Sequence, residues 1–343
     1  MSTHERELLD PVDLCTPDGL SLNHDAMGWS RRTLHRTNLG GYFGRNKRWD
    51  YWGILAGDLL ISVTLADLDS FCLADVYWAE ISTGRTGGHS ALAPQGAISM
   101  PDLPSTTTIS IELEGLNLEV ADKERETTFA VSWTEADGTK SSLDATIQRP
   151  MGLESLNVVI PWHDELFNFT SKHWARPAQG TLTLKSESIE FGQPGGEEAW
   201  GVLDVGRGRW PAKLNWNWGG GAGRVGNHIV ALQFGAKWTD GSGFTENGIL
   251  VDGKLSKIGR DLEWTYDWEN PLEPWRIVDP GGQLDVTLLP RFDKHSALEV
   301  SEDLGSETHQ VFGTWSGSLV TDDGLVLSLH GIEGFAEEAR QRW

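Results

Sequence analysis

Two carboxylates that stand near tryptophans in the middle of the chain have the residue type and surroundings for acid–base chemistry. Residues 201–223 read GVLDVGRGRWPAKLNWNWGGGAG and include Asp204, and the later stretch FTENGIL contains Glu246. A carboxyl group removed from water has a raised pKa and can act as a general acid or base near neutral pH. Tryptophan faces can hold an apolar ligand and stabilise a developing cation. We therefore expect Asp204 and Glu246 to be catalytic.

The same part of the chain supplies candidate ligand-binding side chains. In LDVGRGRWPAKLNWNWG, strict alternation places Leu214, Trp216 and Trp218 on one face of a strand. Asn215 and Asn217 then lie on the other face. The paired tryptophans can line a slot for a flat or apolar ligand, or fill a core. The residues expected to bind the ligand are Arg207, Trp210, Trp216, Trp218, Asn247 and His309.

Several of these candidates also have a purely structural explanation. Arg207 stands close to Asp204, and such a pair is typical of a structural ion pair. Asn247-Gly248 is as typical of a turn as of a polar ligand contact. Arginine beside tryptophan can form cation–π stacks that brace a β fold. Further clusters that mix tryptophan with charged or polar residues lie at 45–55, 266–280 and 308–317.

Familiar cofactor and nucleophile motifs are missing or stand in the wrong context. Gly221-x-Gly223-x-x-Gly226 matches the dinucleotide fingerprint, but the residues after it read as a strand and turn instead of the required helix. These glycines are better explained by a tight turn or by a close approach of the backbone to a neighbour. The sequence has no HExxH or CxxC pair and no GxSxG elbow. We expect no cofactor and no metal.

The elements that must position these residues are β-strands. Apolar and polar residues alternate with period two in both halves of the chain. Asp-Gly pairs, which are typical of the turns in β-hairpins, begin at Asp137, Asp240, Asp252 and Asp323. Short helices are expected only at 164–168 and 334–343. The pattern predicts an all-β protein of antiparallel barrels or sandwiches, because closure removes exposed strand edges. The clearest alternating segments are 59–68, 105–120, 126–138, 179–192, 248–258, 281–290 and 313–331.

The alternation is interrupted around residues 150–178, which suggests two β modules. We expect an N-terminal extension over 1–30, a first β-barrel-like domain over 31–165 and a second over 166–343. The chain has 343 residues, enough for two such domains. Its 17 tryptophans suit either a large β core or a ligand pocket.

The charge argues against several classes of partner. The formal net charge is −22, and such a surface repels nucleic-acid phosphates and anionic lipid headgroups. No apolar run approaches the length of a membrane helix, and the start lacks the pattern of a secretory signal. We expect a cytoplasmic protein that binds a small molecule, not nucleic acid, and does not insert into a membrane.

Five ordered segments carry a family resemblance. They are KRWDYWGIL, LDVGRGRWPAKLNWNWGGGAG, TENGILVDGKL, PWRIVDPGGQLDVTLLP and HQVFGTWSG…GIEGFAEEARQRW. From about residue 30 to the C-terminus the chain resembles the bacterial family called domain of unknown function 2804. More distantly, it resembles the two-domain lipocalin-like proteins that include carotenoid hydratases and tocopherol cyclases. That resemblance implies two calycin-like barrels, with a pocket in one barrel or at their junction. It also implies water addition or ring closure by proton transfer, without a redox cofactor.

Three functions remain open from the sequence. The first is a cofactor-free lyase, hydratase or isomerase that acts on an apolar or amphipathic small molecule in a tryptophan-rich pocket. The second is a lipocalin-like binding protein with the same pocket and no catalysis. The third is a carbohydrate-active enzyme with paired carboxylates, which requires the two groups to stand ~5–9.5 Å apart.

Overall fold

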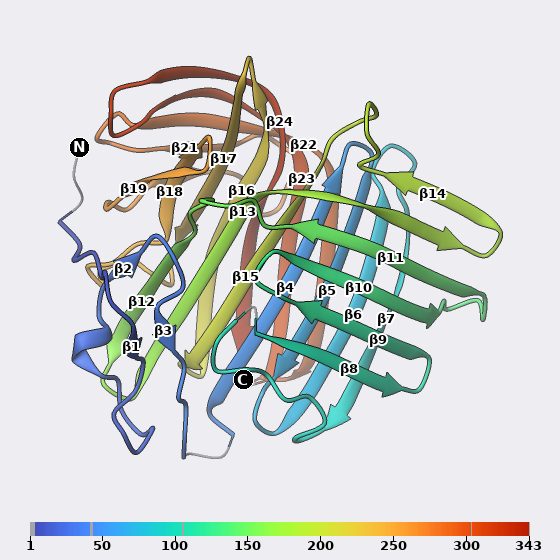
Figure 1. The fold of residues 1–343 in the computed structure, drawn as a ribbon, viewed down its shortest axis with the longest axis horizontal. Coiled ribbons are helices and arrows are strands. Elements are labelled where there is room, and N and C mark those ends of the chain that lie inside the picture. The colour runs from blue at the N-terminus through green and yellow to red at the C-terminus, as the bar shows by residue number, and fades with distance from the viewer. Residues whose placement is uncertain (1–3, 42–43, 105, 303, 343) are drawn as a thin grey trace.

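The computed structural model describes residues 4–41, 44–104, 106–302 and 304–342. Within them the protein is all-β, as predicted, and its one helical element is a 3-10 turn at His24–Ala26 (Figure 1). Two antiparallel sheets carry the fold, and a small parallel pair, β1 (Val12–Asp13) with β3 (His35–Arg36), lies in the N-terminal segment. No helix in the described ranges has the length and hydrophobicity that crossing a bilayer requires.

The first sheet is a nearly closed barrel of thirteen strands. Its main path runs β7-β6-β5-β4-β15-β13-β11-β10-β9-β8, and β7 at one end approaches β9 and β10 at the other. Its strands are β2 (Trp29–Ser30), β4 (Asn46–Ala56), β5 (Leu59–Asp67), β6 (Phe71–Glu80), β7 (Arg85–Pro94), β8 (Thr107–Leu113), β9 (Leu116–Asp122), β10 (Glu126–Thr134), β11 (Lys140–Gln148), β12 (Leu156–His163), β13 (Leu166–Leu184), β14 (Glu187–Phe191) and β15 (Ala199–Arg209).

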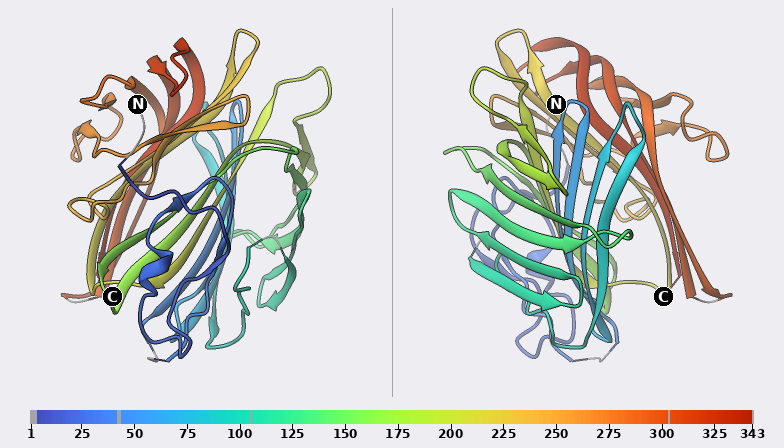
Figure 2. Two further views of the ribbon diagram at one scale, coloured as in Figure 1. Left: turned by 60° about the vertical axis from the view of Figure 1, so that its left-hand side comes forward. Right: turned by 90° about the vertical axis from the view of Figure 1, so that its right-hand side faces the viewer.

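The second sheet is a curled half-barrel of nine strands in the order β19-β18-β17-β16-β24-β23-β22-β21-β20. Its long strands, in yellow to red, lie side by side in both views of Figure 2. The strands are β16 (Lys213–Val225), β17 (His228–Ala236), β18 (Asn247–Val251), β19 (Lys254–Ile258), β20 (Glu263–Thr265), β21 (Trp275–Val278), β22 (Leu284–Ser301), β23 (Leu304–Val320) and β24 (Val326–Arg342).

Asp-Gly turns join neighbouring strands where the sequence predicts them. Gly138, Gly253 and Gly324 have φ of +84°, +78° and +86° and join β10 to β11, β18 to β19 and β23 to β24. Only glycine adopts such angles without a steric penalty. Asp240-Gly241 forms a turn within the longer connection between β17 and β18.

Both expected short helices are wrong. Residues 164–168 run into β13, and residues 334–342 form the end of β24; Trp343 lies outside the described residues. Glu337 and Ala339 favour a helix by local propensity. In the structure β24 instead pairs along its length with both β16 and β23. The backbone hydrogen bonds of two neighbouring strands outweigh the weak local preference.

The glycines of β16 bring tryptophan rings against the backbone. A Cβ on Gly220 would stand 2.4 Å from a ring carbon of Trp174, and one on Gly221 would stand 3.0 Å from Cδ1 of Trp315. β16 continues to Val225, and Gly226 with φ +61° makes the turn to β17. The glycines thus serve close approach and a turn, as predicted, and no helix follows that could bind a dinucleotide.

Each sheet encloses a core of its own, and a third cluster lies between them. This junction cluster joins Tyr51 and Trp174 of the first sheet to Trp218, Phe312 and Phe335 of the second. Ring centroids of Trp218 and Phe335 are 4.7 Å apart, and those of Trp174 and Phe335 are 5.6 Å apart. The packed junction sets the two sheets in a fixed relation and so fixes the walls of any site between them.

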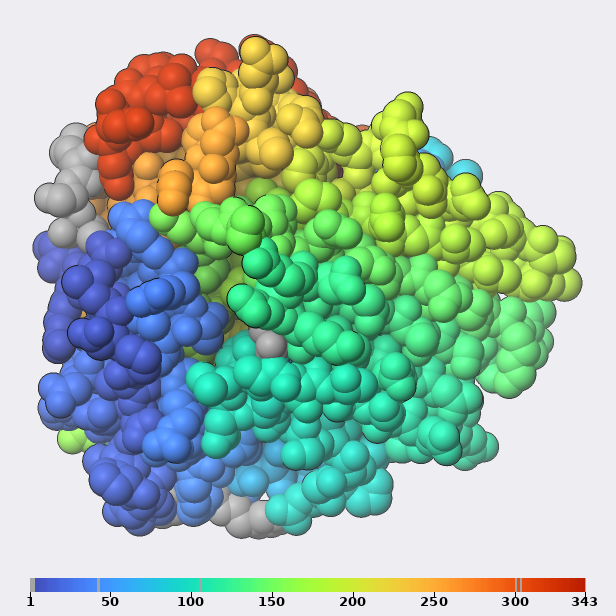
Figure 3. Space-filling view, viewed as in Figure 1, coloured from blue at the N-terminus to red at the C-terminus, as the bar shows by residue number. Residues whose placement is uncertain are grey.

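The chain passes from the first sheet to the second between Arg209 and Lys213, so β13 to β15 belong to the first sheet. The division at 31–165 and 166–343 stays a prediction, because a sheet is not by itself a domain. The N-terminal segment, blue in Figure 3, covers part of the surface beside the first sheet. Leu14, Leu22 and Ala26 of this segment pack on Phe167 and Phe169 of β13.

Candidate functional site

A cavity of about 510 Å³ lies between the two sheets. β4, β13 and β15 supply one wall, and β16, β22, β23 and β24 supply much of the other. Its aromatic lining is Trp49, Tyr51, Phe71, Trp210, Trp216, Trp218 and Trp238. A cavity of this size with mostly apolar walls and a few polar groups is typical of a small-molecule site.

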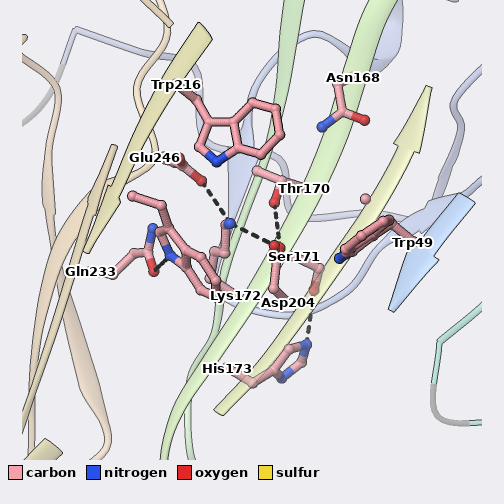
Figure 4. A network of polar contacts seen from close by, with 12 residues as sticks. Trp49, Asn168, Thr170, Ser171, Lys172, His173, Asp204, Trp216, Gln233 and Glu246 are labelled. Carbon is pink, nitrogen blue, oxygen red and sulfur yellow. Dashed lines mark hydrogen bonds and ion pairs between the residues drawn. The ribbon is translucent and has the colours of Figure 1, made fainter. Parts of the chain in front are cut away.

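The polar centre of the cavity is the ammonium of Lys172 on β13 (Figure 4). Lys172 Nζ lies 2.9 Å from Oδ1 of Asp204 and 3.2 Å from Oε2 of Glu246. It also lies 4.3 Å from the centre of the Trp218 ring. The side chains of Lys172 and Glu246 are only 5% and 1% exposed, so the contacts are made away from bulk water. Opposite charges in such a setting interact more strongly than at the surface.

Neighbouring donors orient the two carboxylates. Thr170 donates its hydroxyl to Oδ1 of Asp204 at 3.1 Å, and Trp238 donates Nε1–H to Oε1 of Glu246 at 2.8 Å. Gly235 leaves room for the second carboxylate, because a Cβ there would stand 2.1 Å from Glu246 Oε1. Oε2 of Glu246 faces the ammonium of Lys172 at 3.2 Å.

Burial and neighbouring charges shift the pKa values of both Glu246 and Lys172. Burial raises the pKa of Glu246 to about 7; the nearby Asp204 adds to the rise, and Lys172 opposes it. For Lys172, burial lowers the pKa, but Asp204 and Glu246 outweigh burial and raise it. Lys172 is therefore a stable cation, and Glu246 can hold or release a proton near neutral pH.

A second carboxyl group with a pKa near neutral lines the same cavity. Burial raises the pKa of Glu337 on β24 to about 7, against the hydrogen bond from Trp216 Nε1–H at 2.7 Å and the charge of Lys294. Burial lowers the pKa of Lys294, whose Nζ lies 4.3 Å from the Tyr77 ring centre. Sequence reasoning missed Glu337 and Lys294. A strand assignment for 326–342, together with the register in which β24 pairs with β16, would have put Glu337 beside Trp218.

Five of the eight residues predicted for the site line the cavity: Asp204, Trp210, Trp216, Trp218 and Glu246. The ring centroids of Trp210 and Trp216 are 6.2 Å apart, and Trp210 donates Nε1–H to Asn168 at 3.0 Å. Leu214, Trp216 and Trp218 all face the cavity, as alternation predicts. Asn217 points away and donates to Tyr266 and to the backbone of Glu337.

The other three predicted residues do not line the cavity. Arg207 is three residues from Asp204 and so lies on the opposite face of β15, where it binds Asp50 at 2.7 Å. The prediction that Arg207 pairs with Asp204 is therefore wrong, because Arg207 forms its ion pair with Asp50 instead. Asn247 accepts from Gly235 N–H and donates to Arg260, which joins backbone segments. His309 contacts Asp293, on the face of β23 opposite the cavity.

Solved structures resemble this chain at low sequence identity. Kievitone hydratase from Nectria haematococca matches with a TM-score of 0.50 and 12% identity, over 87% of this chain and 89% of that one. CghA, solved with Sch210972, matches with a TM-score of 0.47 and 11% identity, over 87% and 89%. At these identities the likeness to kievitone hydratase shows a lipocalin-like two-barrel fold and no activity. No curated protein matches the chain. Residues 5–343 match one family model, and the chain belongs to that family, the domain of unknown function DUF2804.

Proposed function

We propose that this protein is a cofactor-free enzyme of the lyase, hydratase or isomerase type, acting by proton transfer on an apolar or amphipathic small molecule. The observation that carries the proposal is Glu246: a buried carboxyl group, with a pKa of about 7, against a lysine in an aromatic cavity. A general acid or base works best when its pKa lies near the working pH.

The two carboxyl groups with a raised pKa suit the two proton steps of a hydration. The protonated Glu246 gives its proton to one alkene carbon, and the tryptophan-rich lining of the cavity stabilises the cation that forms on the other carbon. Water attacks that carbon, and the ionised Glu337 takes the proton that the water loses. One water is thereby added, and solvent returns the proton from Glu337 to Glu246. Asp204 keeps Lys172 in place beside Glu246.

A binding protein without catalysis is the second candidate, because the aromatic lining supports it equally. Paired-carboxylate glycoside chemistry fits less well. Such enzymes place their two carboxyl groups on either side of the scissile bond. Here the ammonium of Lys172 lies between Asp204 and Glu246, at 2.9 and 3.2 Å from them, and fills that space.

The test is proton exchange in D₂O with the full-length protein and a panel of terpenoid alkenes and prenylated phenols. We expect one panel member to take up deuterium or water, and Glu246→Gln to slow this by ~10²–10⁴-fold while binding persists. Glu333→Gln is the control: Glu333 lies on β24, the strand that carries Glu337, and burial raises its pKa to about 7, but it does not line the cavity. Binding with no exchange in any panel member would support the carrier instead.

A further inference from the structure

The hairpin of β22 and β23 carries a second cluster of chemically active side chains. Lys294 and Thr308 line the cavity on one face of this hairpin. His295, Glu307 and His309 alternate with them and share the other face. His295 and His309 are paired across the two strands, and Glu307 lies two residues before His309. One potential ligand atom from each of the three lies within 4.8 Å of the others.

A carboxylate already orients one of the histidines. Nδ1 of His309 lies 2.7 Å from Oδ2 of Asp293, and both side chains are largely buried, at 12% and 17% exposure. If Nδ1 donates its proton to Asp293, Nε2 of His309 keeps a free lone pair. Metal-binding histidines commonly use one ring nitrogen for the metal and give the other to a carboxylate.

We propose that His295, Glu307 and His309 form a site for a divalent transition metal of the zinc class, with Asp293 as its supporting carboxylate. Two imidazoles and one carboxylate leave a fourth position open for water or a ligand, as zinc sites with two His and one Glu do. Nitrogen-rich donor sets of this kind favour zinc and its neighbours over magnesium or calcium.

The cluster needs only side-chain movement to close around an ion. Tetrahedral bonds of ~2.0–2.2 Å put ligand atoms roughly 3.4 Å apart, and His295 Nε2 already lies 3.2 Å from Glu307 Oε1. The rings of His295 and His309 are stacked, with centroids 4.2 Å apart, so one of them must rotate. His295 and Glu307 are 45% and 44% exposed and have room to do so.

Near the proposed metal site, one positive charge opposes cation binding and one aromatic contact holds a histidine ligand in place. Arg340 lies across from Glu307 on β24, but its guanidinium stacks at 3.6 Å on the Trp268 ring and binds Glu338. The Trp268 ring packs against His309, with centroids 4.5 Å apart. No short sequence motif marks this site, because its histidines meet across a hairpin.

Calorimetric titration of ZnCl₂ into the EDTA-treated, desalted full-length protein tests the site. We expect one zinc per chain, and a loss of at least about tenfold in affinity in His295→Gln and in His309→Gln. Asp293→Asn, which keeps all three ligands, should weaken binding by ~10–100-fold. His228→Gln is the control, because His228 also contacts an aspartate, Asp252 at 2.7 Å, without a second histidine.

Several outcomes would overturn the proposal. One is an affinity weaker than roughly 1 mM in the unaltered protein. Another is equal loss in His228→Gln and His309→Gln, which would mean scattered surface binding. A third is unchanged affinity in His295→Gln. Co²⁺ in place of Zn²⁺ supplies a second readout: its visible absorption should become intense in the four-coordinate site and stay weak in His309→Gln. The proposal is independent of the reaction assigned to the cavity.

Discussion

At the scale of single residues, the site combines one side chain that is always charged with two that can be protonated or ionised near neutral pH. Lys172 stays charged because two carboxylates outweigh its burial, while Glu246 and Glu337 are held near the point of ionisation. Buried groups that titrate near neutral pH lower the stability of a fold when they are charged. The fold tolerates this in a cavity, which is where function requires such groups.

Glu337→Gln should therefore stabilise the protein at pH 8 and have little effect at pH 5. The pKa of Glu337 rises from an ordinary value of 4.5 to about 7, so the folded state binds more protons between these values and stability falls as the pH rises through them. Full ionisation of Glu337 lowers the free energy of unfolding by about 3 kcal/mol relative to the protonated state. Gln keeps an oxygen for Trp216 Nε1–H. Denaturant unfolding at both pH values checks this, and equal changes at the two would contradict it.

Lys172→Met should instead destabilise the protein. Removing one partner of a buried ion pair leaves uncompensated charge, which costs roughly 3–5 kcal/mol. Asp204 and Glu246 would then repel each other without their shared cation. The loss should be smaller at pH 5, where Glu246 is protonated. Thermal unfolding at pH 5 and 8 measures this, and a loss independent of pH would show that the charge of Lys172 is not what matters.

At the scale of elements, alternation and turns are the parts of the structure that sequence predicts well. The period-two pattern placed Trp216 and Trp218 on the correct face, and Asp252-Gly253 at the correct turn. Glu337 was out of reach, because a helix-like local sequence hid the strand that carries it. Lys172 was also out of reach, because Asp204 is its cross-strand partner only in the register of β13 and β15, and Glu246 reaches it only when the two sheets pack together.

Gly220→Ala should destabilise the protein by ~1–3 kcal/mol, because the new methyl group would stand 2.4 Å from Trp174 and from the backbone of Leu232. Gly223→Ala on the same strand is the matched control. Its nearest neighbour is the end of the Ile332 side chain, at 3.0 Å, which can move. Denaturant midpoints of the two variants give the comparison. Equal losses would mean that close approach to Trp174 is not the reason for glycine at 220.

At the scale of the whole molecule, several contacts join the two sheets. The junction cluster packs Trp174 against Phe335, and Lys172 binds Glu246 across the cavity. The N-terminal segment touches both sheets, since its core packs on β13 and Glu5 binds Lys257 of β19 at 2.7 Å. The cavity therefore exists only when both sheets are folded.

The two sheets should consequently unfold in one cooperative transition. Shared buried contacts of this extent couple the stability of the parts they join. Tryptophan fluorescence and far-ultraviolet circular dichroism should give coincident curves in urea. Two separated transitions would instead support two independent domains and would allow the boundary expected near residue 165 to be tested by expressing the halves.

Native mass spectrometry of the protein purified from its own host, followed by organic extraction, is the decisive test for a small-molecule site in the cavity. We expect a retained apolar or amphipathic compound. Gly206→Leu should abolish retention, since Gly206 lines the cavity and a Cβ there meets nothing closer than 3.5 Å. Gly196→Leu, in an exposed loop away from the cavity, should retain the compound. A compound held equally by both variants, or an oligosaccharide in its place, would show that the cavity is not a site for an apolar or amphipathic ligand.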